Sequence, residues 1–380
     1  MISAMLLPLV AIAPAGATTN PKATPAAAAP GQLVRWEPIP PIGEHPAWRV
    51  LYSSTDLDGS ISAISGIIAI PNQPIPADGF PLLAVAHPTA GLGRQCAPSL
   101  LLQSNDSLMA NLYQETLTPY LDAGFAIVMS DYQGLGMAGD PSYLIGDIEG
   151  RNVLDSIRAA RQFPEVRLAP SNLLIGHSQG GHAVAFALQL APDYAPEIII
   201  EGAALAAPAL NPAGIFRSII EGDVASENTS LILFVMAAWS ATYPHAALEQ
   251  VTTPTGQELI ETQIAGACLI EAGLAAASYP PSSLFLPDAP VTWAALAAEN
   301  TPAPGPWSTP VLIVHGTADE VIDPRMTTEF VEALCASDTT VDYQQYPGAD
   351  HFGVLSHAQV DLLAWLQDRV AGAPASSTCT

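Results

Sequence analysis

A serine flanked by glycines is the feature of this sequence that most limits how the chain can fold. Residues 173–181 are L-L-I-G-H-S-Q-G-G, so an apolar run leads directly into the pattern G-x-S-x-G, with Ser178 at its centre. In a nucleophile elbow the serine occupies a strained turn between a strand and a helix, and its neighbours two residues away must lack bulk. Gly176 and Gly180 meet that requirement. The alanine-rich run 182–190 that follows is typical of a helix packed tightly on a sheet.

Strands and helices alternate along most of the chain. The runs 49–56 and 61–71, separated by a turn, favour an antiparallel hairpin. Further strands are predicted at 81–88, 124–131, 171–177, 197–206, 309–319 and 341–346, and further helices at 107–122, 147–162, 324–336 and 354–371. This alternation indicates an α/β fold with a mostly parallel central sheet, in which ligands bind at the carboxyl ends of the strands.

The alternation stops between 209 and 307, where the composition shifts to Ala, Leu and Pro. Apolar helical runs are predicted in this segment at 213–221, 229–241 and 258–277. We interpret 209–307 as a helical cap inserted into an α/β core that comprises residues 35–208 and 308–380. The cap runs are too apolar to face water, so they either pack as ordinary core or line a tunnel for an apolar ligand.

The N-terminus has the pattern of an export signal. Residues 1–17 contain an apolar core too short to span a membrane, followed by Ala15-Gly16-Ala17, which fits a cleavage site. No basic residue precedes that core, which leaves a merely apolar N-terminus as the alternative. Residues 18–34 are predicted to be a flexible linker, and no later stretch is a convincing transmembrane helix. We therefore expect a secreted protein, extracellular or periplasmic.

Charge and cysteine content exclude several classes of protein. Eleven basic residues against 36 acidic ones give a net charge of -25, which repels phosphate backbones and argues against a nucleic-acid partner. The four cysteines form no C-x-x-C pair and lack the spacing of a zinc site, so no metal is expected. In an exported protein an even number of cysteines implies two disulfides, among three possible pairings of Cys96, Cys268, Cys335 and Cys379.

A serine hydroxyl is a weak nucleophile, so Ser178 needs an imidazole base and a carboxylate that orients the base. In this fold the histidine comes last in the chain, after the acid. His351 lies in a short loop after a predicted strand and is the candidate base, whereas His357 falls inside the terminal helix. His87 and His177 precede bends and are expected to be packed, hydrogen-bonded residues.

Asp319 is the candidate acid because it ends the predicted strand 309–319, at the same sheet edge as Ser178. The alternative is Asp323, which precedes Pro324 and has the pattern of a helix N-cap. Asp350 neighbours the candidate base in sequence and is expected to point away from it.

An oxyanion hole requires two fixed backbone donors, one from the residue after the nucleophile and one from the loop after the third strand. Gln179 supplies the first donor, and Thr89 or Ala90 in H-P-T-A-G is predicted to supply the second. The competing loop at Tyr132, D-Y-Q-G-L-G, belongs to the next strand and is interpreted as a structural turn.

Taken together, these stretches resemble the secretory lipases of the α/β-hydrolase superfamily, which include fungal extracellular lipases and the cap-bearing yeast lipase A. The matching stretches are R-V-L-Y-S-S-T-D, I-S-G-I-I-A-I-P, A-H-P-T-A-G-L-G-R-Q-C-A-P-S, S-D-Y-Q-G-L-G, G-H-S-Q-G-G and H-G-T-A-D-E-V-I with the late histidine. The resemblance runs from about residue 35 to the end and implies a triad of Ser178, Asp319 and His351. One departure is Pro88, which stands where many relatives have glycine and has no N–H to donate.

The resemblance also implies a function and a disulfide pairing. It implies a triacylglycerol lipase that needs no cofactor and forms an acyl-enzyme, with 209–307 as a lid over an acyl-binding tunnel. It supports pairing Cys96 with Cys268 and Cys335 with Cys379. Alternatives are a carboxylesterase, polyesterase or acyltransferase acting on soluble esters, and a non-catalytic binding protein of the same fold. The expected partner is a lipid or small ester, at or away from a lipid-water interface, while acyl length and oligomeric state stay open.

Overall fold

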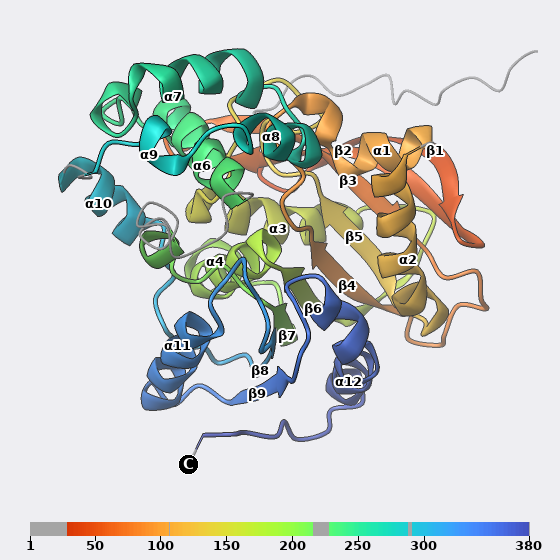
Figure 1. Cartoon of the computed structure of the whole chain (residues 1–380). Helices are drawn as coiled ribbons and strands as arrows, with labels where there is room; N and C mark the ends of the chain where they lie inside the picture. The colour runs from red at the N-terminus through yellow and green to blue at the C-terminus, as the bar shows by residue number, and fades with distance from the viewer. Residues whose placement is uncertain (1–28, 106, 216–227, 288–290, 380) are drawn as a thin grey trace, which may run out of the picture.

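The computed structural model describes residues 29–105, 107–215, 228–287 and 291–379, and within these residues nine strands form one sheet (Figure 1). Its order is β1-β2-β3-β5-β4-β6-β7-β8-β9. The strands are β1 Leu33–Ile42, β2 His45–Thr55, β3 Ile61–Ala69, β4 Phe80–Ala86, β5 Ala126–Ser130, β6 Leu168–His177, β7 Ile200–Ala206, β8 Val311–Gly316 and β9 Val341–Tyr346. β1, β2 and β3 pair antiparallel, and all strands from β5 to β9 in that order run parallel, which is the α/β fold predicted from the sequence.

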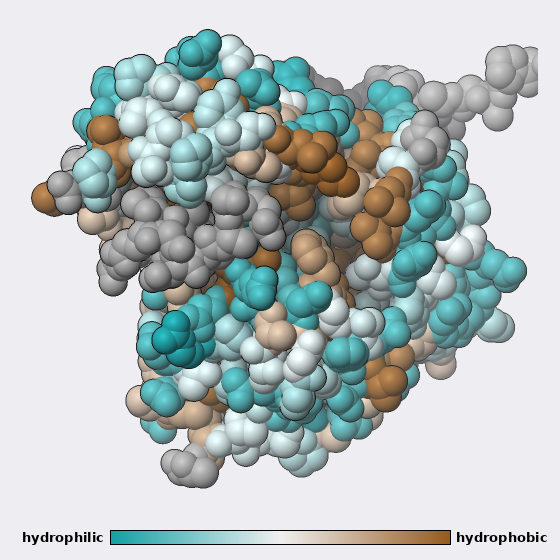
Figure 2. Space-filling view, in the orientation of Figure 1, coloured by the Kyte–Doolittle hydropathy of each residue, from teal (hydrophilic) through white to brown (hydrophobic). Residues whose placement is uncertain are grey.

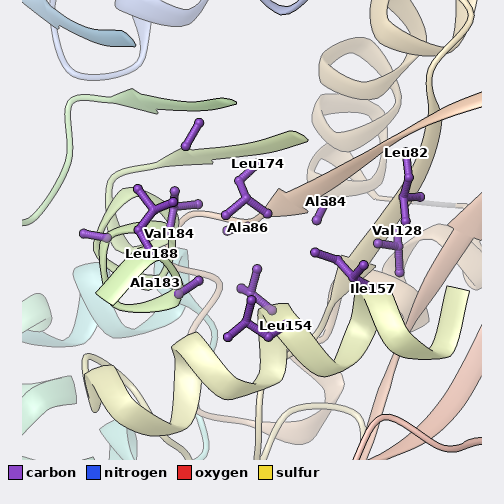
Figure 3. Close-up of a cluster of buried hydrophobic side chains, with 14 of the residues drawn as sticks. Leu82, Ala84, Ala86, Val128, Leu154, Ile157, Leu174, Ala183, Val184 and Leu188 are labelled. Atoms are coloured by element: carbon purple, nitrogen blue, oxygen red, sulfur yellow. The ribbon is translucent and has the colours of Figure 1, made fainter. Parts of the chain in front are cut away.

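Helices cover both faces of the sheet. The core helices are α1 Pro98–Ser104, α2 Leu108–Asp122, α3 Gly146–Ala160, α4 Gln179–Tyr194, α11 Pro324–Ala336 and α12 Gly353–Val370. Figure 3 shows Leu154 and Ile157 of α3 and Val184 of α4 packed against Leu82 and Leu174 of the sheet. Side chains of α2 and α12 belong to a second buried cluster on other strand residues. Because both faces are covered, the central strands are buried throughout, as their continuous apolar sequences indicate.

The segment between β7 and β8 is helical and packs in an apolar cluster that it shares with Leu92, Ile322 and residues around the start of α3. Its helices are α6 Thr229–Thr242, α7 Pro254–Leu259, α8 Leu269–Ala276, α9 Pro281–Leu284 and α10 Val291–Glu299, with a π-helical turn at Ile260–Ile264. They gather on one side of the sheet in Figure 1 and bury a separate apolar cluster that includes Leu233, Trp239 and Leu296. The run predicted at 213–221 lies largely outside the described residues, as do residues 1–17 and 18–28 of the predicted signal and linker.

The secondary structure differs from the predicted elements in three places. β1 and α1 were not predicted, and β1 begins inside the segment 18–34 that was interpreted as a linker. The single helical run predicted at 258–277 is broken between Ile264 and Leu269. The break has a physical cause, because the chain leaves the helix there to pair with the loop after β4 through the antiparallel bridge Gly91–Cys268.

Two disulfides connect distant parts of the described chain. One joins Cys96, just before α1, to Cys268 at the start of α8, and the other joins Cys335 of α11 to Cys379 near the C-terminus. These are the two pairs that the family resemblance supports. No helix among the described residues is long and apolar enough to cross a membrane.

Candidate active site

Ser178 stands at the sharp turn between β6 and α4. Its φ of 57° lies in the left-handed region that side chains rarely adopt. A Cβ atom on Gly176 would lie 2.1 Å from the carbonyl oxygen of Gly180, and one on Gly180 would lie 1.9 Å from that of Ala86. Neither contact is possible, so both glycines of the G-x-S-x-G pattern are required by the backbone that presents Ser178.

Asp319 and His351 are hydrogen-bonded to each other and follow neighbouring strands. His351 Nδ1 lies 2.7 Å from Asp319 Oδ2, and both residues are buried. The other carboxylate oxygen, Oδ1, accepts the backbone N–H groups of Val321 at 2.8 Å and Ile322 at 2.9 Å. The aspartate is therefore held in one orientation and, by accepting from Nδ1–H, leaves His351 Nε2 available as an acceptor.

A second histidine, His315, binds the same aspartate and was missed in the sequence. It lies in β8, with Nε2 3.0 Å from Asp319 Oδ2 and Nδ1 2.9 Å from the hydroxyl of Thr327. Burial would raise the pKa of Asp319, but the hydrogen bonds from His315 and His351 lower it below its ordinary value. The signal that could have identified it is a single polar side chain in the apolar strand V-L-I-V-H-G, four residues before the candidate acid.

His177 supports the loop of the candidate base. It precedes Ser178, and its Nε2–H donates to the backbone carbonyl of His351 at 2.8 Å. The two imidazole rings are 4.7 Å apart. Burial, reinforced by the neighbouring His351, lowers the pKa of His177 to about 3. The packed, hydrogen-bonded role expected from the sequence is present, and it is directed at the candidate base.

Ser178 and His351 line the same cavity, of about 100 Å³, together with Thr89. No hydrogen bond between Ser178 and His351 occurs among the described residues, although such contacts often tighten only when substrate is bound. A second cavity, of about 20 Å³, is also lined by Ser178 and Leu231. Figure 2 shows a hollow between the cap and the core with hydrophobic residues along its rim.

The candidate oxyanion donors both lie close to Ser178. Gln179 is the first residue of α4, and Thr89 lines the cavity at Ser178. Within the described part of the chain, no hydrogen bond uses the backbone N–H of either residue. Ala90 is buried beside them, and its carbonyl accepts the N–H of Leu269 from the cap. In the competing loop, the N–H of Tyr132 already donates to Ser130, which agrees with a structural turn.

The other residues weighed from the sequence have structural roles. Asp323 caps α11 by accepting the N–H of Arg325, and Asp350 accepts the N–H of Gly353 at 2.6 Å. His357 is exposed on α12. His87 is buried, with its ring nitrogens near the carbonyl oxygens of Pro88 and Asp131. None of these side chains lines either cavity at Ser178.

Ser178, Asp319 and His351 thus follow β6, β8 and β9 at one edge of a mostly parallel sheet, in the chain order serine, acid, histidine. This arrangement defines the α/β-hydrolase fold. Solved structures agree with it. Candida antarctica lipase A in its closed state has a TM-score of 0.78 at 23% identity, covering 96% of this chain and 89% of that one. The rice cell wall degrading esterase LipA from Xanthomonas oryzae has a TM-score of 0.73 at 19% identity, covering 90% and 98%.

The family follows from sequence comparison. A model of the secretory lipase family matches residues 103–285, and a model of the prolyl oligopeptidase family matches residues 292–371. A secreted triacylglycerol lipase of Malassezia globosa is 27% identical over 354 residues, which cover 88% of this chain and 75% of that protein. A probable inactive lipase of Mycobacterium tuberculosis is 27% identical over 346 residues, covering 86% and 74%. Residues 103–285 thus match the secretory lipase family, and the chain is similar to secreted lipases over most of its length.

The protein is extracellular, as expected from the sequence. Residues 103–285 match the model of a secretory lipase family, and the similar proteins include secreted lipases of Malassezia. Both pairs of cysteines form disulfides, which persist in oxidising compartments.

Proposed function

We propose that this protein hydrolyses acylglycerol esters through an acyl-enzyme on Ser178, with His351 as general base and Asp319 as the group that orients it. The observation that carries the proposal is the cavity shared by Ser178 and His351, in which the imidazole is already bonded to a buried carboxylate. The assigned family of secretory lipases supports ester substrates.

In the first half of the reaction, Ser178 Oγ attacks the ester carbonyl and its proton passes to His351 Nε2. The carbonyl becomes a tetrahedral oxyanion, which accepts hydrogen bonds from the backbone N–H groups of Gln179 and Thr89. Asp319 stabilises the imidazolium without taking its proton. The intermediate collapses, the bond to the leaving alcohol breaks, and His351 returns the proton to that alcohol.

In the second half, water attacks the acyl-Ser178 ester while His351 Nε2 takes a proton from it. A second tetrahedral intermediate forms at the same donors and then releases the fatty acid and the Ser178 hydroxyl, which regains its proton. Atoms and charges balance without an added cofactor.

We further propose that residues 209–307 form a cap over the acyl chain and that residues 35–208 and 308–380 form the catalytic core. Leu231 of α6 and Leu269 of α8 line the cavity at Ser178, so an acyl group there would contact cap side chains. α8 also exposes Ile270 and Leu274, which suits an apolar substrate arriving from a lipid phase.

A second candidate function is a carboxylesterase for short, soluble esters. The size of the cavities favours it, because the smaller of the two is about 20 Å³, little more than one water-sized group requires. A third candidate is a non-catalytic protein, since one relative is named a probable inactive lipase.

The test is a series of p-nitrophenyl esters with acyl chains from short to long, measured for the wild type and for Ser178→Ala. The proposal expects hydrolysis, labelling of one Ser178 peptide by a serine-directed phosphonate, and loss of both in the variant. Highest kcat/KM on long chains favours the lipase, and highest kcat/KM on acetate favours the esterase. A wild type that hydrolyses none of the esters and takes no phosphonate would leave the non-catalytic candidate.

A further inference from the structure

A buried carboxylate holds the side chain of one proposed oxyanion donor. Glu149 lies on α3, and its side chain is fully buried. Its Oε1 accepts hydrogen bonds from Gln179 Nε2 at 2.6 Å and from the backbone N–H of Leu144 at 3.0 Å. Its Oε2 lies 3.3 Å from His182 Nδ1. None of the steps of ester hydrolysis requires this carboxylate, so its burial calls for another explanation.

The geometry shows how this burial is tolerated. His182 Nε2 lies 2.8 Å from the backbone carbonyl oxygen of Asn300, which can only accept, so Nε2 carries a hydrogen. The contact of His182 Nδ1 with Glu149 Oε2 gives the second carboxylate oxygen a partner as well. Both oxygens of Glu149 are thus engaged, which a buried polar group requires.

The same hydrogen bonds continue into the cap. Asn300 follows α10 and is 2% exposed. Its Oδ1 accepts the N–H of Gly146, at the start of α3, at 2.9 Å, and its Nδ2 donates to the hydroxyl of Tyr243, which follows α6, at 3.1 Å. A buried polar chain thus connects the cap, α3 and the first turn of α4.

Glu149 also bears on the second proposed donor. Leu144, whose N–H it accepts, has a φ of 51°, a conformation that a leucine adopts only when its surroundings hold it there. The preceding residue, Tyr143, has its hydroxyl 3.0 Å from Thr89 Oγ1. One carboxylate therefore fixes Gln179 directly and Thr89 through the segment 143–144.

We propose that Glu149 is a positioning residue for the oxyanion hole. It holds Gln179 and the segment 143–144 so that the backbone N–H groups of Gln179 and Thr89 converge on one point. Through His182 and Asn300 it links that point to the position of the cap. This inference rests on the proposed function. Removing one oxyanion donor outright costs about 10²–10³ in kcat, so displacing the donors should cost less.

The test compares Glu149→Leu, which removes both acceptor oxygens, with Glu149→Gln, whose amide can still accept from Gln179 and donate to His182 Nδ1. We expect Glu149→Leu to lower kcat by about 10- to 100-fold with little change in KM. Its inhibition constant for a trifluoromethyl ketone, which forms an oxyanion on Ser178, should rise by the same factor. Glu149→Gln should restore both values to near those of the wild type.

Asp155→Asn is the matched control, because Asp155 is another fully buried carboxylate on α3 and binds Ser54 and Tyr194 instead. It should lower the melting temperature while leaving the inhibition constant unchanged. A purely structural role for Glu149 predicts the same result for Glu149→Leu, and that result would overturn the inference.

Gln179→Met provides a second, independent test, since it keeps the backbone N–H and removes only the side-chain amide. It should lower kcat and weaken binding of the trifluoromethyl ketone by the same factor. The double variant with Glu149→Leu should lose no more kcat than the more damaging single variant. Additive losses would contradict action through Gln179. If Glu149→Leu does not fold, Gln179→Met alone decides. Full activity in Ser178→Ala would refute the proposed function, whereas full activity in Gln179→Met with an inactive Ser178→Ala would refute only this inference.

Discussion

The two sides of the cavity at Ser178 are built from different interactions. On the side of β8, the two carboxylate oxygens of Asp319 take part in four hydrogen bonds with two histidines and two backbone N–H groups. On the cap side, the walls are largely apolar, and Leu231 lines both cavities, of about 100 and 20 Å³. The Asp319 side is held by directional hydrogen bonds, and the cap side is held by the packing of apolar side chains.

This difference teaches which property each side controls. Hydrogen bonds are directional and fail when a partner is lost, so the Asp319 side determines whether a proton can be moved at all. Apolar packing has no direction and tolerates changes of shape, so the cap side determines which acyl groups fit. The comparison predicts that changes at Asp319 abolish turnover on every ester, whereas changes in the cap redistribute turnover among esters.

The largest expected effect is that of Asp319→Asn. The amide cannot accept from His351 as the carboxylate does and favours the wrong imidazole tautomer, which should lower kcat by about 10⁴-fold on all chain lengths. Asp323→Asn is the control, because Asp323 only caps α11 beside exposed Arg325. Steady-state kinetics on acetate and long-chain esters provide the measurement. A loss confined to long chains would contradict the division between the two sides.

Removing each disulfide in turn should distinguish an effect on stability alone from an effect on both stability and activity. By chain entropy, the bond from Cys96 to Cys268, 172 residues apart, contributes about 5 kcal/mol, and that from Cys335 to Cys379, 44 apart, about 4 kcal/mol. Double Cys→Ser variants should both unfold at lower temperature. Only Cys96→Ser/Cys268→Ser should also lower kcat/KM, because Cys268 pairs with Gly91 in the loop that carries Thr89. Equal values of kcat/KM in both double variants would contradict the expectation that the bond from Cys96 to Cys268 positions the loop that carries Thr89.

Much of the core side could be predicted from the sequence. The glycines at 176 and 180 constrain the backbone locally, so the elbow was visible in nine residues. Strand-helix alternation then gave the sheet and the loops that carry Asp319 and His351. The disulfide pairing could not be derived from the residues alone, because three pairings were open, and it came from the family resemblance.

The remaining features depend on contacts between distant segments. Glu149 follows a helix start in a run of ordinary composition, and nothing local indicates that its partners are Gln179 and His182. The break at 265–268 arises because the cap pairs with the loop at Gly91, far earlier in the chain, as the bridge from Gly91 to Cys268 shows. The roles assigned to Ser178 and its partners stay predictions until turnover is measured.

The substitution Leu231→Ala tests whether the cap side controls the length of the acyl chain. Because Leu231 lines both cavities, we expect that removing its side chain enlarges the space beside Ser178. An acyl chain longer by one or two methylenes should then be buried, at about 0.8 kcal/mol or roughly fourfold in kcat/KM per methylene. Rates on acetate esters should stay within twofold. Val360→Ala, at an exposed position of α12 that lines neither cavity, is the control and should leave the chain-length profile unchanged. An unchanged profile in Leu231→Ala would mean that Leu231 is not the barrier.

The smallest expected effect concerns His177, on the Asp319 side of the cavity. It is a change in how the free energy of unfolding depends on pH. Burial lowers the pKa of His177 to about 3, whereas an unfolded chain has a histidine pKa of about 6.5. Between these values the unfolded state binds one more proton than the folded state, so this residue costs about 1.4 kcal/mol of stability for each pH unit lost. That contribution is absent above pH 6.5 and grows as the pH falls.

His177→Gln removes the titrating group but keeps an amide that can donate to the carbonyl of His351. Relative to the wild type, the unfolding free energy of the variant should therefore improve by about 1 kcal/mol for each pH unit between pH 6 and pH 4. Urea titrations at four pH values measure it, with exposed His357→Gln as the control that should follow the wild type. Parallel curves for wild type and His177→Gln would mean that His177 is protonated in the folded protein. The imidazolium of His177 would then lie beside His351. During turnover, when His351 is also protonated, the Asp319 side would have to hold two positive charges instead of one.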